Sequence, residues 1–118
     1  ANFEEVYSSF RVFIIDVDGT ILNGDALIPG TLDSVYRLLT DESKKVIFYT
    51  NGGYCTLQHS YNKVHAWLKD NLPAEKWTLI EAKVNISMMY NTAQLAAKYL
   101  LSALPENAKV LTFGNEGF

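Results

Sequence analysis

The sequence predicts an α/β domain with a parallel sheet, and three observations predict it. Two unbroken apolar runs, residues 12–15 and 46–49, each end in polar residues, which is typical of strands buried on both faces. Stretches with apolar residues at helical spacing separate such runs. The connections are long enough to hold helices, so we expect the strands to lie parallel.

Length and composition favour a single domain with a real core. The chain has 118 residues, of which 48% are hydrophobic and 13% aromatic. The net charge is −3 and the ten basic residues are scattered, so nucleic acid and anionic membrane are poor candidates for a partner. No apolar run approaches the roughly 20 residues of a membrane span, and the start lacks the features of a signal peptide. With one cysteine, Cys55, the sequence favours a cytoplasmic location.

The first half of the chain carries clear signals for its elements. Asp16 stands where the first strand reaches solvent, and residues 21–30 hold Asn-Gly and Pro-Gly turn pairs that predict a small flap beside it. Apolar residues at helical spacing predict helices over 31–40 and 54–71, on either side of the strand at 46–49.

The second half is predicted to continue the alternation. A third strand is expected over 77–80 and a third helix over 83–102, with its methionines as core fillers. A fourth strand is expected over 109–113, followed by a strand-to-helix turn at 114–118. The expected order is therefore βαβαβαβ.

A pair of carboxylates follows the first strand. Asp16 and Asp18 are two residues apart and Gly19 can turn the chain, so both carboxyls can reach one small site at the edge where ligands bind in open α/β sheets. One carboxylate can attack phosphorus while the other passes a proton, with a cation such as Mg²⁺ neutralising the phosphate charge. In the alternative interpretation, Asp16 caps a turn and Asp18-Gly19 is a favoured turn dipeptide.

Polar groups also follow the second strand. Thr50 offers a hydroxyl, and Gly52 and Gly53 allow backbone N–H groups to approach an anion at the start of the next helix. Read alone, the Thr50-Asn51-Gly52-Gly53 segment is a good turn and helix cap. Together with the first strand it favours a phosphate site.

These motifs resemble the first two motifs of the haloacid dehalogenase superfamily. The residues that carry the resemblance are 13–22, Gly24, 29–30 and 48–51. Their spacing and the closing stretch 110–118 are most similar to subfamily IIA, the nitrophenylphosphatase and NagD-like phosphatases. The resemblance spans about residues 12–118 and implies a Rossmann-like, three-layer αβα fold with a parallel sheet.

The resemblance also implies roles for single residues. Asp16 would be the nucleophile and a Mg²⁺ ligand, and Asp18 the general acid and base that binds the metal through its backbone carbonyl. Thr50 would hydrogen-bond the transferring phosphoryl group. Asn51 and nearby backbone N–H groups, those of Gly52 and Gly19, would assist.

Parts of the family's machinery have no counterpart in the sequence. The family's third motif supplies a lysine and its fourth supplies acidic metal ligands, and both follow a cap domain that is absent here. We therefore expect residues 1–118 to be the amino-terminal half of a core domain, truncated and inactive alone, with weak Mg²⁺ binding. Exposed sheet edges and uncovered apolar strand faces would favour association.

The leading hypothesis is thus a Mg²⁺-dependent phosphate monoester hydrolase that acts on a small phosphorylated metabolite through an aspartyl-phosphate. An alternative is a non-catalytic half-domain that binds phosphate or a protein. A phospho-accepting receiver domain fits less well, because its phosphorylated Asp ends the third strand, where this chain has Glu81.

Overall fold

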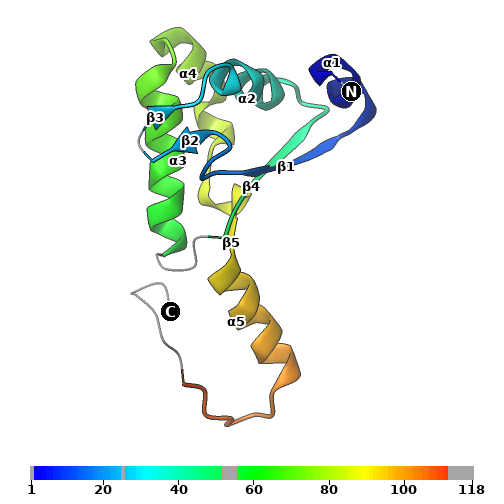
Figure 1. Ribbon diagram of the computed structural model, residues 1–118, viewed down its shortest axis with the longest axis vertical. Helices are drawn as coiled ribbons and strands as arrows, with labels where there is room; N and C mark the ends of the chain where they lie inside the picture. The colour runs from blue at the N-terminus through cyan, green and yellow to red at the C-terminus, as the bar shows by residue number, and fades with distance from the viewer. Residues whose placement is uncertain (1, 25, 52–55, 112–118) are drawn as a thin grey trace.

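A parallel three-stranded sheet with strand order β1-β4-β5 forms the centre of the fold in the computed structural model (Figure 1). The structure describes residues 2–24, 26–51 and 56–111. The strands are β1 (Val12–Asp16), β4 (Lys45–Thr50) and β5 (Met89–Asn91). The predicted α/β class and its parallel sheet are confirmed, and both apolar runs of the first half form strands.

Side chains that share a register position lie on the same face of the sheet and divide it into a covered and an open face. On the covered face Phe48 stands opposite Met89, and both are buried in the core. On the open face Val12 is 51% exposed and Ile14 69% exposed. The sheet is therefore buried on one side only in the described part of the chain, and the uncovered apolar face predicted above is present.

Three helices cover the buried face. α2 (Thr31–Thr40) has the predicted bounds and buries Val35, Leu38 and Leu39. α3 (Leu57–Asn71) follows its N-cap Thr56, whose side chain accepts a hydrogen bond from the His59 N–H, and α4 (Ala74–Ile80) packs beside it. The expected three-layer αβα fold has a helical layer on each face of the sheet. The described residues form the layer on the covered face. The start predicted for α3, at residues 54–55, lies outside the described residues.

The predicted flap is a two-stranded antiparallel hairpin beside the carboxyl end of β1. It consists of β2 (Leu22–Asn23) and β3 (Ala26–Leu27), and Leu22 pairs with Leu27. Gly24 has φ +64° between the two strands, a backbone conformation in which a residue without a Cβ is favoured. The Asn-Gly turn signal in the sequence thus located the hairpin correctly.

The strand predicted over 77–80 is wrong, because this segment lies in α4. Pro73 stands at the N-cap and Ala74-Glu75-Lys76 favours helix over strand. Trp77 and Ile80 are buried while Leu79 is 69% exposed. Burial three residues apart is the period of a helix, which a run of four apolar and β-branched residues concealed.

The single helix predicted over 83–102 is also wrong. The chain instead forms two 3-10 turns, η1 (Glu81–Lys83) and η2 (Ile86–Met88), then β5 and α5 (Thr92–Ala103). Two asparagines interrupt the helix, because their side chains bond nearby backbone groups. Asn85 accepts from the Ser87 N–H at 3.0 Å, and Asn91 accepts from the Gln94 N–H at 2.8 Å as the N-cap of α5.

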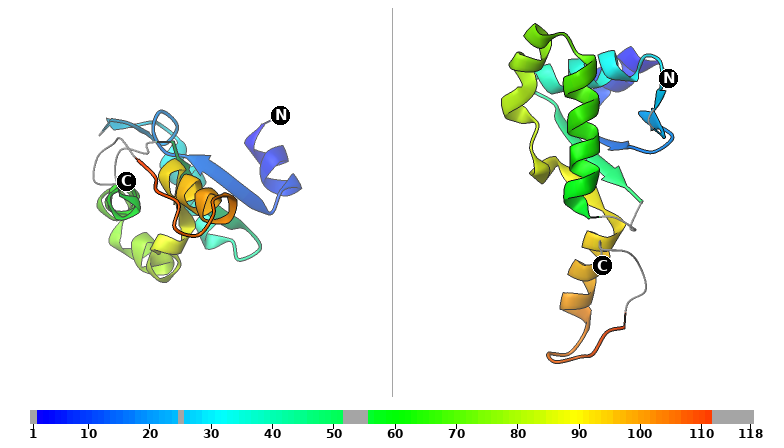
Figure 2. Two further views of the ribbon diagram at one scale, coloured as in Figure 1. Left: turned by 90° about the horizontal axis from the view of Figure 1, so that it is seen from below. Right: turned by 90° about the vertical axis from the view of Figure 1, so that its left-hand side faces the viewer.

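α5 projects away from the sheet and its helical layer, as two perpendicular views show (Figures 1 and 2). It contacts β5 where it begins, and Tyr99 and Leu101 farther along are 68% and 85% exposed. In the segment predicted as a fourth strand, residues 109–111 form no strand, and residues 112–113 lie outside the described residues, as does the turn predicted at 114–118.

α1 (Phe3–Ser9) is held against the amino end of β1 and α2 by charged groups. The Tyr7 ring lies between the Arg37 guanidinium, 4.0 Å from the ring centroid, and the Lys44 ammonium, at 4.7 Å. The Tyr7 hydroxyl donates to the Asp41 carboxylate. Hydrogen bonds from the Ser43 side chain and then from Tyr7 lower the pKa of Asp41 from its ordinary 3.8 to about 2. The carboxylate is thereby favoured in its charged form.

Candidate active site

The first candidate residue, Asp16, ends β1 at the carboxyl edge of the sheet. In the β1–β4 register it stands opposite Tyr49, one residue before Thr50. Its carboxylate oxygen Oδ1 accepts a hydrogen bond from the backbone N–H of Val17 at 2.9 Å. The strand alternation places Asp16 on the open face of the sheet, and its side chain is exposed.

A tight loop after Asp16 positions Asp18. The carbonyl of Val17 accepts hydrogen bonds from the N–H groups of Ile21 (3.1 Å) and Leu22 (3.2 Å), and Val17 itself is 2% exposed. The N–H of Gly19 donates back to the Leu22 carbonyl at 2.6 Å. Gly19 has φ +83°, so the loop needs a residue that adopts this conformation without strain. Asp18 therefore lies on a short loop that is anchored in the core by the buried Val17.

Thr50, at the end of β4, meets Asp18 as the sequence predicted. Its hydroxyl Oγ1 donates to Asp18 Oδ2 at 3.3 Å, although the two residues are 32 positions apart in the chain. Thr50 is 3% exposed. It stands opposite Asn91 in the β4–β5 register, and Asn91 is 2% exposed. The side chains of Thr50 and Asn91 lie on the covered face of the sheet, whereas that of Asp16 lies on the open face. The candidate site therefore includes residues from both faces at the carboxyl edge of the sheet.

Lys63 on α3, a residue that no sequence motif singled out, reaches the same carboxylate. The Lys63 ammonium lies 2.8 Å from Asp18 Oδ1, with the two side chains 31% and 41% exposed. On α3, Ser60, Val64 and Trp67 are buried. Lys63 lies at the margin of this buried face, since it is three residues after Ser60 and four before Trp67. The approach of α3 to the β1 loop is a long-range contact that no local pattern encodes.

Two of the remaining predicted phosphate ligands, Gly19 and Asn51, adjoin residues of this group. Gly19 contributes its backbone in the loop that carries Asp18. Asn51 directly follows Thr50, and its backbone carbonyl accepts a hydrogen bond from the Thr92 hydroxyl at 3.3 Å. Gly52 lies outside the described residues. The structure thus brings Asp18, Thr50 and Lys63 into contact, with Asp16 at the adjacent strand end.

The donors at this edge suit a hard cation in kind but not in number. Carboxylate and hydroxyl oxygens are ligands of the type that Mg²⁺ prefers. Among the described residues, however, no three His, Cys, Asp or Glu side chains gather closely enough to hold a metal ion. The Lys63 ammonium also occupies one oxygen of Asp18. In the part of the chain that the structure describes, the carboxylates that this edge offers to a cation are those of Asp16 and Asp18.

The chain belongs to the haloacid dehalogenase-like hydrolase family, whose model matches residues 13–118. This match confirms the resemblance stated from the motifs at residues 13–22 and 48–51. None of the described helices is long and apolar enough to cross a lipid bilayer.

Particular relatives carry the similarity further. Phosphoglycolate phosphatase 1A, chloroplastic, of Arabidopsis thaliana is 29% identical over 117 residues, which is 98% of this chain and 28% of the relative. This chain therefore spans less than a third of that relative's length.

Two solved structures share the fold. Hypothetical protein PH1952 from Pyrococcus horikoshii OT3 matches with a TM-score of 0.67 at 19% identity, covering 92% of this chain and 36% of that one. A 4-nitrophenylphosphatase from Thermotoga maritima matches with a TM-score of 0.55 at 22% identity, covering 79% and 30%.

Proposed function

We propose that this chain carries the nucleophile-bearing part of a phosphate monoester hydrolase that works through an aspartyl-phosphate. The observation that carries the proposal is the contact between Thr50 Oγ1 and Asp18 Oδ2 at 3.3 Å, made at the strand edge where Asp16 emerges. Membership of a hydrolase family and similarity to proteins named as phosphatases support the same chemistry.

In this proposal Asp16 and Asp18 divide the reaction into two displacements. A carboxylate oxygen of Asp16 attacks phosphorus, a new O–P bond forms, and the bond from phosphorus to the alcohol oxygen breaks. Asp18 gives its proton to the departing alcohol. Water then attacks phosphorus and loses a proton to Asp18, and the Asp16–phosphorus bond breaks to release inorganic phosphate and restore both carboxyl groups.

The neighbouring groups bind the phosphoryl oxygens. The Thr50 hydroxyl, which contacts Asp18 in the structure, is a donor at the point of transfer. The Lys63 ammonium adds positive charge beside Asp18. Backbone N–H groups of Asn51 and Gly52 complete the proposed cradle, whereas the Gly19 N–H donates to the Leu22 carbonyl and shapes the loop instead. These donors favour the charge that develops on phosphate during transfer.

Mg²⁺ is the cation proposed for this site, held by the Asp16 side chain and the Asp18 backbone carbonyl. When bound, it neutralises phosphate charge that would repel the Asp16 carboxylate. Because the described residues lack a cluster of three acidic ligands, we expect these residues by themselves to bind Mg²⁺ weakly.

The substrate proposed is a small phosphorylated metabolite. The named relatives act, by their names, on phosphoglycolate and on 4-nitrophenyl phosphate, which are both phosphate monoesters. Because this chain spans about a third or less of these relatives, we propose that it supplies half of a core domain. The additional length in the relatives would then complete the pocket and select the ester.

Hydrolysis of 4-nitrophenyl phosphate in the presence of Mg²⁺ tests the proposal. The assay compares the 118-residue chain and the longest product of its reading frame, each with its Asp16→Asn variant. We expect activity in the longer product and its loss in the variant. A matched control is Asp70→Asn, an exposed carboxylate on α3, which should leave the activity unchanged. Equal activity with and without Asp16 would refute the nucleophile.

The second candidate function is phosphate binding without turnover. The ion pair between Lys63 and Asp18 favours it, because the Lys63 ammonium contacts a carboxylate oxygen of Asp18 that the acid–base step would need. Calorimetry with inorganic phosphate and this chain distinguishes the two. Binding with no hydrolysis by the longer product would support a binding module, and absence of binding by folded protein would count against it.

A further inference from the structure

The chain is more extended than a compact folded monomer of its length. Its radius of gyration is 16.4 Å, whereas a compact domain of 118 residues has one of about 13.5 Å. Its solvent-accessible surface is 8001 Å², against about 6,500 Å² for a compact folded chain of the same mass. The excess of about 1,500 Å² is surface that a folded protein ordinarily buries.

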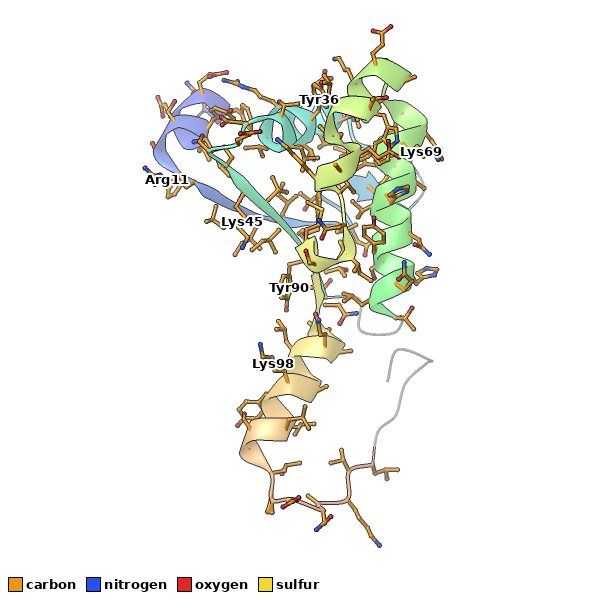
Figure 3. The ribbon with its side chains drawn as sticks, turned by 180° about the vertical axis from the view of Figure 1, so that it is seen from behind. Arg11, Tyr36, Lys45, Lys69, Tyr90 and Lys98 are labelled. Atoms are coloured by element: carbon orange, nitrogen blue, oxygen red, sulfur yellow. The ribbon has the colours of Figure 1, made fainter. Side chains whose placement is uncertain are left out.

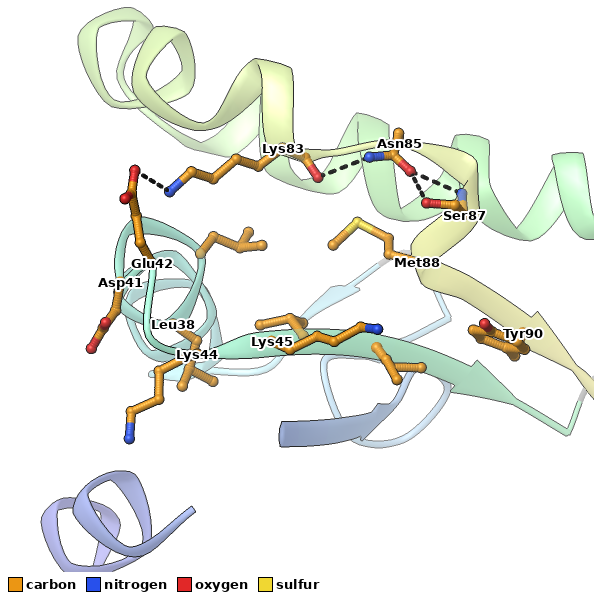
Figure 4. Close-up of a pocket in the computed structure, with 13 residues that line it drawn as sticks. Leu38, Asp41, Glu42, Lys44, Lys45, Lys83, Asn85, Ser87, Met88 and Tyr90 are labelled. Carbon is orange, nitrogen blue, oxygen red and sulfur yellow. Dashed lines mark hydrogen bonds and ion pairs between the residues drawn. The ribbon is translucent and has the colours of Figure 1, made fainter. Parts of the chain in front are cut away.

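The open face of the sheet contributes to this excess. Because paired positions of parallel strands share a face, the register places these apolar and aromatic side chains on it: Val12, Ile14, Ile47, Tyr49 and Tyr90. Lys45 stands opposite Val12 at the amino end of this face, and its side chain extends along β4 toward Tyr90 (Figure 4). The open face therefore combines an apolar surface with a basic residue at one end.

α5 and the segment that follows it present a second apolar surface. From Gln94 to Leu111 the residues are exposed, except for the half-buried Leu100. This part of the chain forms an apolar groove of ≈ 590 Å³, whose lining includes Ala97, Leu100, Leu101, Leu104 and Val110. Of the described residues that line the groove, the charged one is Glu106. A helix that is apolar on several sides is ordinarily buried, so this surface also lacks a partner in the described part of the chain.

The start of α5 is fixed so that the helix points away from its own sheet. The Thr92 hydroxyl donates to the Asn51 carbonyl at 3.3 Å, and Ala93 is 8% exposed. The Asn91 side chain accepts from the Gln94 N–H at 2.8 Å, while Asn91 itself pairs with β4. Figure 3 shows α5, marked by Lys98, extending from the end of the sheet that carries Tyr90. To cover its own open face, α5 would have to break these contacts.

We infer that two copies of this chain form a symmetric dimer in which α5 of each copy covers the open face of the other. A two-fold axis perpendicular to the long axis of the molecule, which measures 49 Å, allows both contacts at once. Val12 and Ile14 then pack against the partner's groove, and Lys45 lies near the partner's Glu106. The inference uses shape, exposure and charge, and it does not rest on the proposed function.

The areas are those of a stable dimer. If each copy buries its excess of about 1,500 Å², the interface totals about 3,000 Å², which lies within the roughly 2,000–5,000 Å² of obligate homodimers. Closure of α5 onto its own sheet would bury the same surfaces and leave a monomer. The oligomeric state therefore distinguishes the two arrangements.

Sedimentation equilibrium of the 118-residue chain over a range of concentrations is the first test. We expect a species of twice the chain mass to predominate at about 10 µM, because interfaces of standard size already reach micromolar or tighter affinity. A folded chain that remains monomeric throughout the range would overturn the inference.

One substitution on each surface then locates the interface. Ile14→Asp on the open face and Leu101→Asp on α5 should each raise the dimer dissociation constant by about tenfold or more, because each places a carboxylate in an apolar contact. Leu79→Asp on α4 is the matched control, because Leu79 is 69% exposed, as Ile14 is, and lies in the helical layer on the other side of the sheet. An unchanged dissociation constant in either interface variant would refute the assignment.

A mixing experiment tests the exchange of α5 between copies. A dimer of Ile14→Asp with Leu101→Asp keeps one intact contact, between the unaltered open face of the second and the unaltered α5 of the first. Each variant alone has none, so the equimolar mixture should form more dimer than either variant by itself. Open faces that packed on each other would leave Leu101→Asp fully dimeric, and failure of the mixture to form additional dimer would reject the exchange.

Charge reversal gives a gain of affinity that loss of fold cannot imitate. Lys45→Glu and Glu106→Lys should each weaken the dimer by about two- to tenfold, since each replaces an attraction with a repulsion at a partly exposed pair. The double variant restores opposite charges and should recover most of the loss. A double variant as weak as its weaker parent would contradict the proposed pairing of Lys45 with the partner's Glu106.

Discussion

Removal of the Lys63 ammonium is the most direct test of the charge arrangement at the candidate active site. Lys63 lies 2.8 Å from Asp18, and the two side chains are 31% and 41% exposed. At such exposure water screens the attraction, so the coupling free energy between the two groups should be about 0.2–1 kcal/mol rather than that of a buried pair.

A double-mutant cycle measures this coupling. The four proteins are the wild type, Lys63→Met, Asp18→Asn and the double variant, each unfolded by urea at pH 7. Lys63 makes a further contact besides the one to Asp18, so a single variant mixes several effects and the cycle isolates the pair. The coupling should be larger in 0.01 M than in 1 M salt, because the screening length falls from about 30 Å to about 3 Å.

Two results would refute this reasoning. A coupling near zero in 0.01 M salt would show that the ammonium and carboxylate do not interact in solution. A coupling of several kcal/mol, insensitive to salt, would show that the pair is buried more deeply than its exposed fractions indicate. Lys69→Met on the same helix serves as the control and should show no coupling to Asp18.

Three further predictions concern stability, measured by urea unfolding. The lowered pKa of Asp41, caused first by the Ser43 side chain and then by Tyr7, stabilises the fold fully above the ordinary pKa of 3.8; this contribution is lost as the pH falls through about 2. Asp41→Asn should therefore flatten the loss of stability between pH 5 and 2. Gly19→Ala should cost about 1–2 kcal/mol, because φ is +83° there while the space around the added Cβ is open. Phe48→Ala should cost about 3–5 kcal/mol, since Phe48 is fully buried.

Each of these has its own contradicting outcome. An unchanged acid profile in Asp41→Asn would show that the carboxylate is not selectively stabilised in the folded state. Gly19→Asn should lose less than Gly19→Ala, because Asn tolerates positive φ, and the reverse order would reject strain as the cause. Phe48→Leu should lose less than Phe48→Ala, and an equal loss would mean that cavity size does not decide the cost.

The sequence predicted best where local signals agreed with one another. The helix at 31–40 has apolar residues at a clean helical period, and the strands at 12–15 and 46–49 are continuous apolar runs, so pattern and burial gave the same answer. The contact between Asp18 and Thr50 was predictable for the same reason, because the carboxyl ends of adjacent parallel strands meet at one edge.

The predictions failed where short-range chemistry or long-range contact decided the structure. Trp77 to Ile80 has strand-like composition, but Pro73 and the residues after it start a helix. Asn85 and Asn91 cap backbone groups and divide the segment expected to be one helix. Lys63 reaches Asp18 across 45 positions, a pairing that depends on how α3 lies against the β1 loop.

The alternation along β1 has a consequence for how catalysis and packing are linked. Val12, Ile14 and Asp16 project from the same face of the sheet, and the first two are the most water-exposed apolar side chains of that strand. Any layer that shelters this hydrophobic row also forms a wall beside the proposed nucleophile. The same covering layer would exclude water from Val12 and Ile14 and enclose the Asp16 carboxylate. A protein in which Val12 and Ile14 stay exposed to water therefore also leaves the proposed nucleophile exposed to bulk solvent.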